Sequence, residues 1–223
     1  MLIGKLPRAI TALLIANVAA FLLQFVLRGL AYPLMLWPID IAAPWQLSGR
    51  GFLPWQLLTY GFLHADLGHL FFNMLALVMF GSQLEHRWGH RKFLIYYLVC
   101  VLAAGLCQLL LASIMVHQGD APYPTLGASG GVYGVVLAFG LLFPNERIMV
   151  FPLPFFVRAR TVAIVFALGS LFYGIIGVRD GIAHFAHLGG MLGGWLLLRY
   201  WQGGGPRRRV PPPRTPTHLR RVK

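Results

Sequence analysis

The chain has 223 residues, of which 57% are apolar and only 11% are charged, and it carries a net charge of +13 at neutral pH. A chain with so few charged residues cannot cover its surface well enough to be a water-soluble globular protein. The positive charge would suit a nucleic-acid-binding protein, but the basic residues follow a membrane topology, so no nucleic-acid partner is expected. Composition therefore favours an integral membrane protein in contact with the lipid bilayer.

Six apolar stretches approach the roughly 20 residues needed to cross about 30 Å of hydrocarbon. They cover residues 8–29, 68–85, 92–116, 129–143, 160–178 and 183–201. The first stretch lacks a clear small-x-small cleavage site after it, so we expect a retained helix rather than a signal peptide. The sequence thus predicts an all-α membrane protein with a bundle of six transmembrane helices. Residues 1–203 would form one domain, and residues 204–223 a basic, Pro/Arg-rich, disordered cytoplasmic tail.

The positions of the basic residues predict how the chain is oriented. With a cytoplasmic N-terminus, sixteen Lys and Arg residues face the cytoplasm, and only Arg28, Arg50 and Arg179 lie outside. This asymmetry is what the positive-inside rule expects for six spans with both termini in the cytoplasm.

The segment from about residue 30 to 60, between the first two spans, is apolar but cannot be a continuous helix. Four prolines interrupt it and three tryptophans lie within it: Pro33, Pro38, Pro44 and Pro54, and Trp37, Trp45 and Trp55. Tryptophan favours the headgroup zone of a bilayer. Two interpretations remain open, a structured segment in the outer leaflet and a long extracellular connector.

The third span carries the two cysteines of the chain, Cys100 and Cys107. They are about 10 Å apart along one helix, too far for a disulfide, and are expected to be small packing residues.

The fourth span is too short to cross the bilayer. Between Ser129 and Pro144 there are about 15 helical residues, or roughly 22 Å of rise. Pro144 and the polar residues after it place the helix end at the cytoplasmic surface, so Ser129 must lie below the outer surface. Residues 119–128 must then enter the membrane as irregular backbone, which is tolerated only beside protein or a wet cavity. The sequence predicts a water-accessible hollow that opens outward, with a serine at its floor.

This serine lies at the start of a helix in the segment Gly-Ala-Ser-Gly-Gly-Val-Tyr-Gly, residues 127–134. Unpaired backbone amides at a helix N-terminus can hold a developing oxyanion. Gly127 and its small neighbours would let a substrate backbone approach, and Gly130 and Gly134 would let another helix pack closely. Small residues around a serine are also common in membrane helices, so this motif alone leaves a simple packing role open.

The sixth span supplies a histidine that could act on this serine. His187 shares one helical face with Gly190 and Gly194, and this face could pack against the glycine face of the fourth span. An ionisable residue inside a span is a functional candidate. His184, one turn earlier, is expected to be a boundary residue.

The second span adds His64, His69 and Asn73. His69 and Asn73 are four residues apart on one helical face, and both carry donors that could point to the same oxyanion. A metal site would compete with this interpretation, but there is no His-Glu-x-x-His pair and Asp66 is the one acid nearby. We therefore expect no metal and no cofactor.

Taken together, the motifs resemble those of the bacterial rhomboid proteases from residue 8 to about 201. The resemblance rests on several motifs in order: Trp55 nine residues before His64; His64, His69 and Asn73; Glu85-His86-Arg87-Trp88-Gly89; Gly127-Ala128-Ser129-Gly130; and Ala186-His187-Leu188-Gly189-Gly190. One departure is Gln56, where the family often has arginine, and it puts in doubt how the outer segment is anchored.

The resemblance implies an intramembrane serine endopeptidase with a Ser129/His187 dyad and no acid. It implies an oxyanion hole formed by the Ser129 amide and the His69 and Asn73 side chains. Tyr133 would pack against the ring of His187, while His64 and Glu85 would support the fold. Substrates would be single-span or multi-span membrane proteins, and the location a bacterial inner membrane.

Two other functions compete with a protease. A catalytically dead relative would bind and escort membrane proteins, but it would lack the serine or the histidine, and both are present. A small transporter would use the histidines and Asp66 as a proton or solute path, but no paired half-repeat supports it.

Overall fold

The computed structural model describes residues 6–27, 29, 31–39, 51–149, 155–176 and 183–203. The expectations for the tail from residue 204, and for Arg28, Pro44, Trp45, Arg50 and Arg179, lie outside these residues. The described chain is mostly helical. Its α-helices are α1 (Arg8–Val26), α2 (Gln56–Thr59), α3 (Leu67–Ala76), α4 (Ser82–Trp88), α5 (His90–His117), α6 (Ser129–Leu142), α7 (Ala159–Ile175) and α8 (His184–Gly203).

Shorter elements connect these helices. One turn of 3₁₀-helix covers Tyr32–Leu34 and another covers Tyr60–Phe62, and a π-helical turn, Leu77–Gly81, joins α3 to α4. Two strands, β1 (Arg147–Met149) and β2 (Phe156–Arg158), pair as an antiparallel hairpin between α6 and α7. The all-α prediction did not include this hairpin.

Three described helical segments are long and apolar enough to cross a membrane: Arg8–Val26, Leu67–Trp88 and His90–His117. The apolar helices α6 and α7 are shorter. All six predicted stretches coincide with helical segments whose ends lie within about three residues of the prediction. These helices make the chain an integral membrane protein, while the count of six spans stays a prediction.

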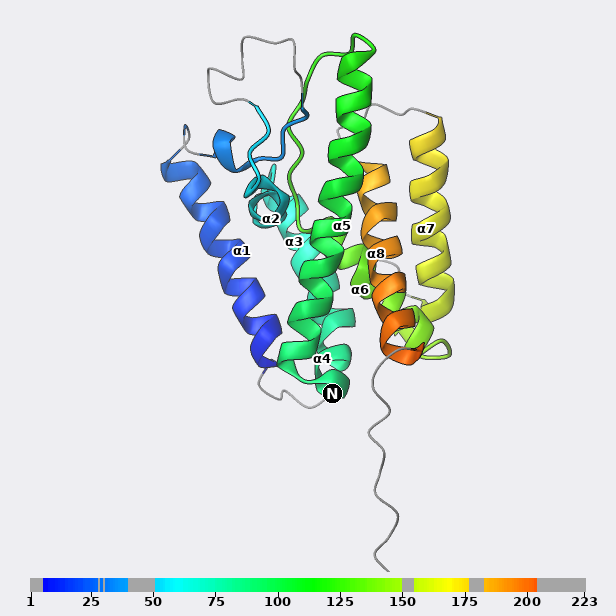
Figure 1. Cartoon of the computed structure of the whole chain (residues 1–223). Helices are drawn as coiled ribbons and strands as arrows, with labels where there is room; N and C mark the ends of the chain where they lie inside the picture. Colours follow the sequence, from blue (N-terminus) through cyan, green and yellow to red (C-terminus); the bar gives the residue numbers. More distant parts are fainter. Residues whose placement is uncertain are drawn as a thin grey trace, which may run out of the picture.

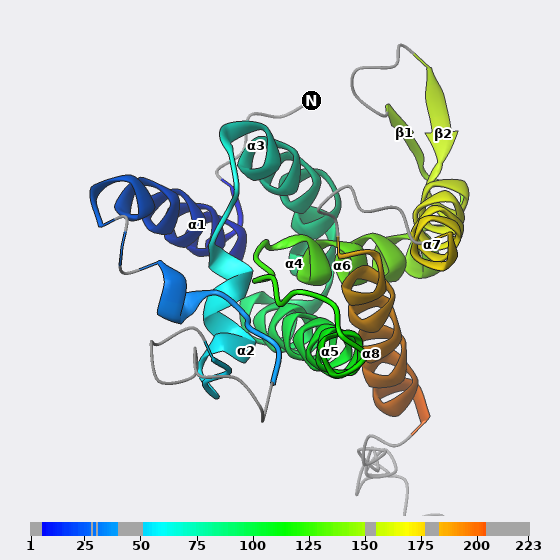
Figure 2. The same cartoon turned by 90° about the horizontal axis from the view of Figure 1, so that it is seen from above.

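Helix α6 lies in the middle of the bundle. Figure 1 shows α1, α5, α7 and α8 as long, roughly upright helices, and the view from above in Figure 2 places α6 among α3, α5, α7 and α8. Residues 118–128, which lead into α6, contain no helix, as predicted. Helix α6 has 14 residues, or about 21 Å of rise, and α5 has 28. Gly130 faces Ala104 in the middle of α5, so Ser129 begins its helix about halfway along that neighbour.

Small residues let the helices pack closely around α6. A Cβ atom at Gly190 would meet the carbonyl group of Gly130, which places α8 against α6 as predicted. Gly134 faces Cys100 of α5, and Gly194 faces Tyr96 and Cys100 of the same helix. A Cβ atom at Gly134 would also lie 3.1 Å from the Gly190 carbonyl oxygen, so the glycines of α6 and α8 face each other at Gly190, while α5 provides the nearest atoms to Gly194.

Buried polar side chains hold the outer elements in place. The Glu85 carboxylate of α4 accepts hydrogen bonds from the backbone N–H groups of Ala9 and Ile10, at 2.8 and 2.9 Å. These groups have no partner within α1, because the first N–H groups of any helix lack one. A negative charge at this position also complements the helix dipole. Glu85 thus fixes the start of α1 to the rest of the bundle.

Gln56 anchors the segment before α2 and is fully buried. Its Oε1 atom accepts a hydrogen bond from the Trp37 backbone N–H, and its Nε2 atom donates to the carbonyl groups of Pro33 and Gly51. One neutral amide therefore joins three points of this segment. Although the rhomboid family often has arginine at this position, Gln56 anchors the described part of the segment.

Candidate active site

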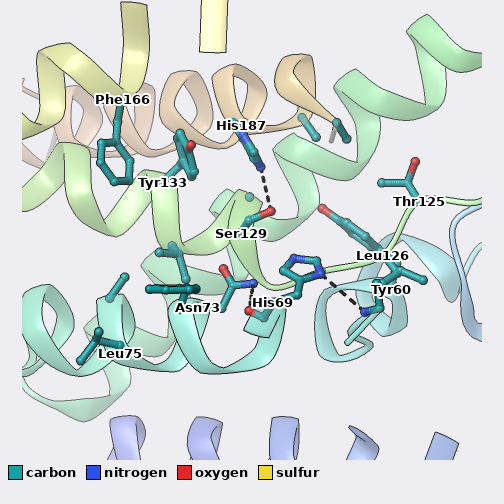
Figure 3. Close-up of a pocket in the computed structure, with 18 of the residues that line it drawn as sticks. Tyr60, His69, Asn73, Leu75, Thr125, Leu126, Ser129, Tyr133, Phe166 and His187 are labelled. Carbon is teal, nitrogen blue, oxygen red and sulfur yellow. Dashed lines mark hydrogen bonds between the residues drawn. The ribbon is translucent and has the colours of Figure 1, made fainter. Parts of the chain in front are cut away.

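The structure brings Ser129 and His187 together. Ser129 is the first residue of α6 and His187 lies in the first turn of α8. The Nε2 atom of His187 is 2.8 Å from Ser129 Oγ, a hydrogen-bond distance, as Figure 3 shows. Since His187 is 5% exposed and Ser129 is half-buried, the pair lies inside the bundle with one side open to a cavity.

The ring of Tyr133 stacks on the ring of His187. The ring centroids are 3.9 Å apart and the ring planes differ by 12°. Tyr133 is one turn after Ser129 on α6, so the same helix that carries the serine also holds the plane of the imidazole. His184 stacks on Tyr173 instead, with centroids 5.5 Å apart.

His69 and Asn73 lie on the opposite side of Ser129 from His187 (Figure 3). The His69 backbone N–H donates to the Asp66 side chain at 2.8 Å, so Asp66 acts as the N-cap of α3. The Asn73 amide donates to the carbonyl group of His69 at 3.0 Å, which leaves its second N–H for another acceptor. Both side chains line the cavity.

The contacts of His69 indicate which of its ring nitrogens carries the proton. The Nδ1 atom accepts a long hydrogen bond, 3.5 Å, from the Ala65 backbone N–H. The proton of the neutral ring is then on Nε2. A Cβ atom at Gly127 would lie 2.9 Å from His69 Nε2 and 3.6 Å from Ser129 Oγ. Gly127 also has φ of +132°, so glycine alone suits this position, and its lack of a side chain lets the His69 donor approach Ser129.

His64 is behind His69 and is 1% exposed. The two rings meet edge to face, 5.0 Å apart, and the His64 backbone N–H and carbonyl group both bond to the Gln24 side chain of α1. Neither of its ring nitrogens has a hydrogen-bond partner. Burial, and next the nearby His69, lower the pKa of His64 to about 4, so it is neutral at physiological pH. A neutral, enclosed ring suits a support for His69 and does not suit a proton carrier.

The cavity next to these residues has a volume of about 740 Å³. Its walls come from α3, α6, α7, α8 and the irregular segment before α6, and Ser129, His187, His69 and Asn73 are among the residues that line it. Within the described residues, no three His, Cys, Asp or Glu side chains gather closely enough to hold a metal ion. The cavity is thus lined by a serine hydroxyl group, two imidazole rings and a side-chain amide.

Sequence reasoning missed two polar side chains near the site. Gln24 of α1 holds the turn that carries His64, and Ser170 of α7 contacts His187 from behind, with its Oγ atom 3.4 Å from Nδ1. In the sequence, the one sign that Gln24 and Ser170 could matter is that each is a polar residue within an apolar stretch. Such a signal does not reveal the partner across the bundle.

If His69 and Asn73 are donors to the oxyanion of a peptidase reaction, His69→Ala and Asn73→Ala should each lower the kcat of peptide cleavage by about 10- to 1000-fold. One oxyanion donor contributes at most ~2.7 to 4 kcal/mol to the stability of the transition state. Initial rates with purified protein in detergent would measure this loss, and thermal midpoints would show whether the fold is kept. His117→Ala, at the exposed end of α5, is the matched histidine control. An unchanged rate in either variant would remove that side chain from the oxyanion hole.

Comparison with known proteins gives the family of the chain. The Rhomboid domain family model matches residues 52–201. The Rhomboid protease GluP of Bacillus subtilis is 33% identical over 142 residues, 64% of this chain and 25% of GluP. RHOMBOID-like protein 2 of Arabidopsis thaliana is 28% identical over 88% of this chain and 60% of its own, and Rhomboid protein 1, mitochondrial, of Saccharomyces cerevisiae is 36% identical over 65% and 42%. The chain thus spans a quarter to three fifths of these relatives, and it belongs to the rhomboid family.

Proposed function

We propose that this protein is an intramembrane serine endopeptidase that cleaves single-span or multi-span membrane proteins. The observation that carries the proposal is the 2.8 Å contact between Ser129 Oγ and His187 Nε2, two residues that line the cavity. One of the relatives that is named as a protease, Rhomboid protease GluP, supports the same activity. Six spans, cytoplasmic termini and a bacterial inner membrane complete the proposal.

The reaction begins when His187 Nε2 takes the proton of Ser129 as Oγ attacks a peptide carbonyl carbon. The carbonyl oxygen becomes an oxyanion, and the Ser129 backbone N–H, the His69 ring and the Asn73 amide are its donors. His187 then gives its proton to the leaving amine, the C–N bond breaks, and an acyl-enzyme forms. A water molecule from the cavity attacks this ester, again with His187 as the base, and releases the second product.

The position of Ser129 determines which peptide bonds it can reach. A substrate helix must open before its carbonyl groups are accessible, and an unpaired backbone group is costly in hydrocarbon but less so in a wet cavity. Glycine destabilises a helix by ~1 kcal/mol and proline by ~3 kcal/mol relative to alanine. The best substrates should therefore have weak helices near the outer end of the span, with a small residue at the cleaved bond.

A single-span substrate with an Ala or Gly site near its outer boundary tests this proposal in liposomes. Replacing the nearby glycines and prolines by leucine should slow cleavage by roughly 10- to 100-fold, since 1.4 kcal/mol corresponds to a factor of ten. Moving the same helix breakers to the other end of the span is the matched control. Gel analysis and mass spectrometry would give the rate and the cleaved bond. Equal rates for the leucine-rich substrate, or a cut in the cytoplasmic half, would contradict an outward-opening site.

A further inference from the structure

The hydroxyl group of Ser170 lies behind the imidazole of His187. Its Oγ atom is 3.4 Å from Nδ1, while Nε2 on the other side of the ring is 2.8 Å from Ser129 Oγ. Ser170 is 3% exposed and His187 is 5% exposed. The three side chains thus form a line across the bundle, from α6 through α8 to α7.

The direction of the proton transfer determines what Ser170 must do. His187 Nε2 can take the Ser129 proton only if it carries none, so the proton of the neutral imidazole must be on Nδ1. A buried N–H group without a partner is costly, about 1–3 kcal/mol. Ser170 Oγ is placed to accept this hydrogen, which would favour the tautomer that the reaction needs.

Stacking on Tyr133 does not by itself orient the base. It holds the plane of the ring, but a half-turn about the Cβ–Cγ bond keeps the same plane and exchanges each nitrogen with a carbon position. After that half-turn, Nε2 would no longer face Ser129. A polar partner at the Nδ1 side distinguishes the two orientations, and Ser170 occupies that side. The Tyr133 side chain itself interacts with Ser170.

We propose that Ser170 is a positioning residue for His187, a role that rests on the proposed function. Its hydroxyl accepts the Nδ1 hydrogen and holds the ring in the productive tautomer and orientation. A buried aspartate does this in soluble serine proteases and also stabilises the imidazolium ion. A neutral hydroxyl gives the orientation with a weaker charge effect, because hydrogen bonds to ionised groups are about twice as strong.

Ser170→Thr and Ser170→Val provide the sharpest test, since the two residues have nearly the same shape and differ by a hydroxyl against a methyl group. We expect the Ser170→Thr variant to keep kcat within about 3-fold of the unchanged protein. Val should lower kcat by about 10- to 100-fold with KM within about 2-fold, because the base is misplaced in the reaction rather than in substrate binding. Ser170→Ala should have the same kcat and KM as Ser170→Val. It removes the hydroxyl group without adding bulk, so it still tests the proposal if valine does not fit at this position.

Gly169→Ala is the matched control on α7. A Cβ atom at Gly169 has no atom within 4 Å, so this variant should keep the full rate. Nitrogen-15 NMR of labelled histidines, with the His187 signals assigned by their loss in His187→Ala, gives a readout independent of the rate. In the Ser170→Thr variant the His187 ring should carry its proton on Nδ1, and in the Ser170→Val variant it should be a mixture of the two tautomers.

Equal kcat values for Thr and Val, or an unchanged His187 tautomer in Val and Ala, would overturn the positioning role. The same assay includes Ser129→Ala. Cleavage by Ser129→Ala would overturn the proposed function itself. Equal Thr and Val rates beside an inactive Ser129→Ala would overturn only the role of Ser170.

Discussion

Ser129→Ala and His187→Ala are each expected to abolish cleavage, with a loss on the order of 10⁴-fold or more, while the protein stays folded. The nucleophile and its base act as one unit, so the double variant should be no slower than either single variant. Cleavage of a single-span substrate in detergent measures the rate. A fluorophosphonate probe that reacts with activated serines should label the unchanged protein and neither variant.

Two control variants distinguish the loss of the Ser129/His187 dyad from a general effect of replacing a serine or a histidine. Ser82→Ala removes a serine on α4 whose hydroxyl bonds the carbonyl group of Val78, and His117→Ala removes an exposed histidine. Both should keep nearly the full rate. If Ser129→Ala or His187→Ala cleaved the substrate at close to that rate, a different nucleophile or base would have to be found.

The helices and the start of a short helix at Ser129 could be predicted because local rules determine them. Apolar stretches near span length coincide with helical segments, and the short run from Ser129 to Pro144 predicts a helix that begins inside the bundle. The pairing of His69 with Asn73 follows from helical spacing in the same way. These inferences need only the order of residues along one segment.

Contacts between distant segments could not be predicted in this way. Glu85 binds the start of α1, 75 residues away, and Gln56 joins three backbone groups before α2. Ser170 of α7 contacts His187 of the neighbouring helix α8. The family resemblance implied that Glu85 supports the fold, and it singled out Gln56. Only the packing of the bundle shows which buried groups these side chains and Ser170 contact.

The π-helical turn and the hairpin were missed for a different reason. A period of 3.6 residues describes a regular helix, so it gives no sign of the extra residue at Leu77–Gly81. The hairpin between α6 and α7 has strands of three residues, with Ile148 paired to Val157 on the packed face. Such short strands do not produce an alternation that stands out from an apolar loop.

Gly190→Ala is expected to impair both stability and activity, although glycine to alanine within a helix is normally stabilising by about 0.5–1 kcal/mol. The added Cβ atom would meet the carbonyl oxygen of Gly130 and lie 2.8 Å from its carbonyl carbon. These are backbone atoms of α6, which cannot rotate aside as the end of a side chain can. Helix α8 would have to move away from α6, and overpacking of this kind costs about 1–3 kcal/mol.

The same displacement would separate the dyad, because Gly130 follows Ser129 directly and Gly190 is one turn after His187. A misplacement of about 1 Å can cost on the order of 100-fold in rate. Gly190→Ala should therefore lower the thermal midpoint in detergent. At temperatures below that midpoint, where the variant is still folded, its kcat should be reduced by at least about 10-fold. Gly169→Ala, the same substitution in open space, should do neither. A Gly190→Ala protein with an unchanged midpoint and rate would show that α6 and α8 do not approach at Gly130, and the dyad would then need another means of holding its two helices together.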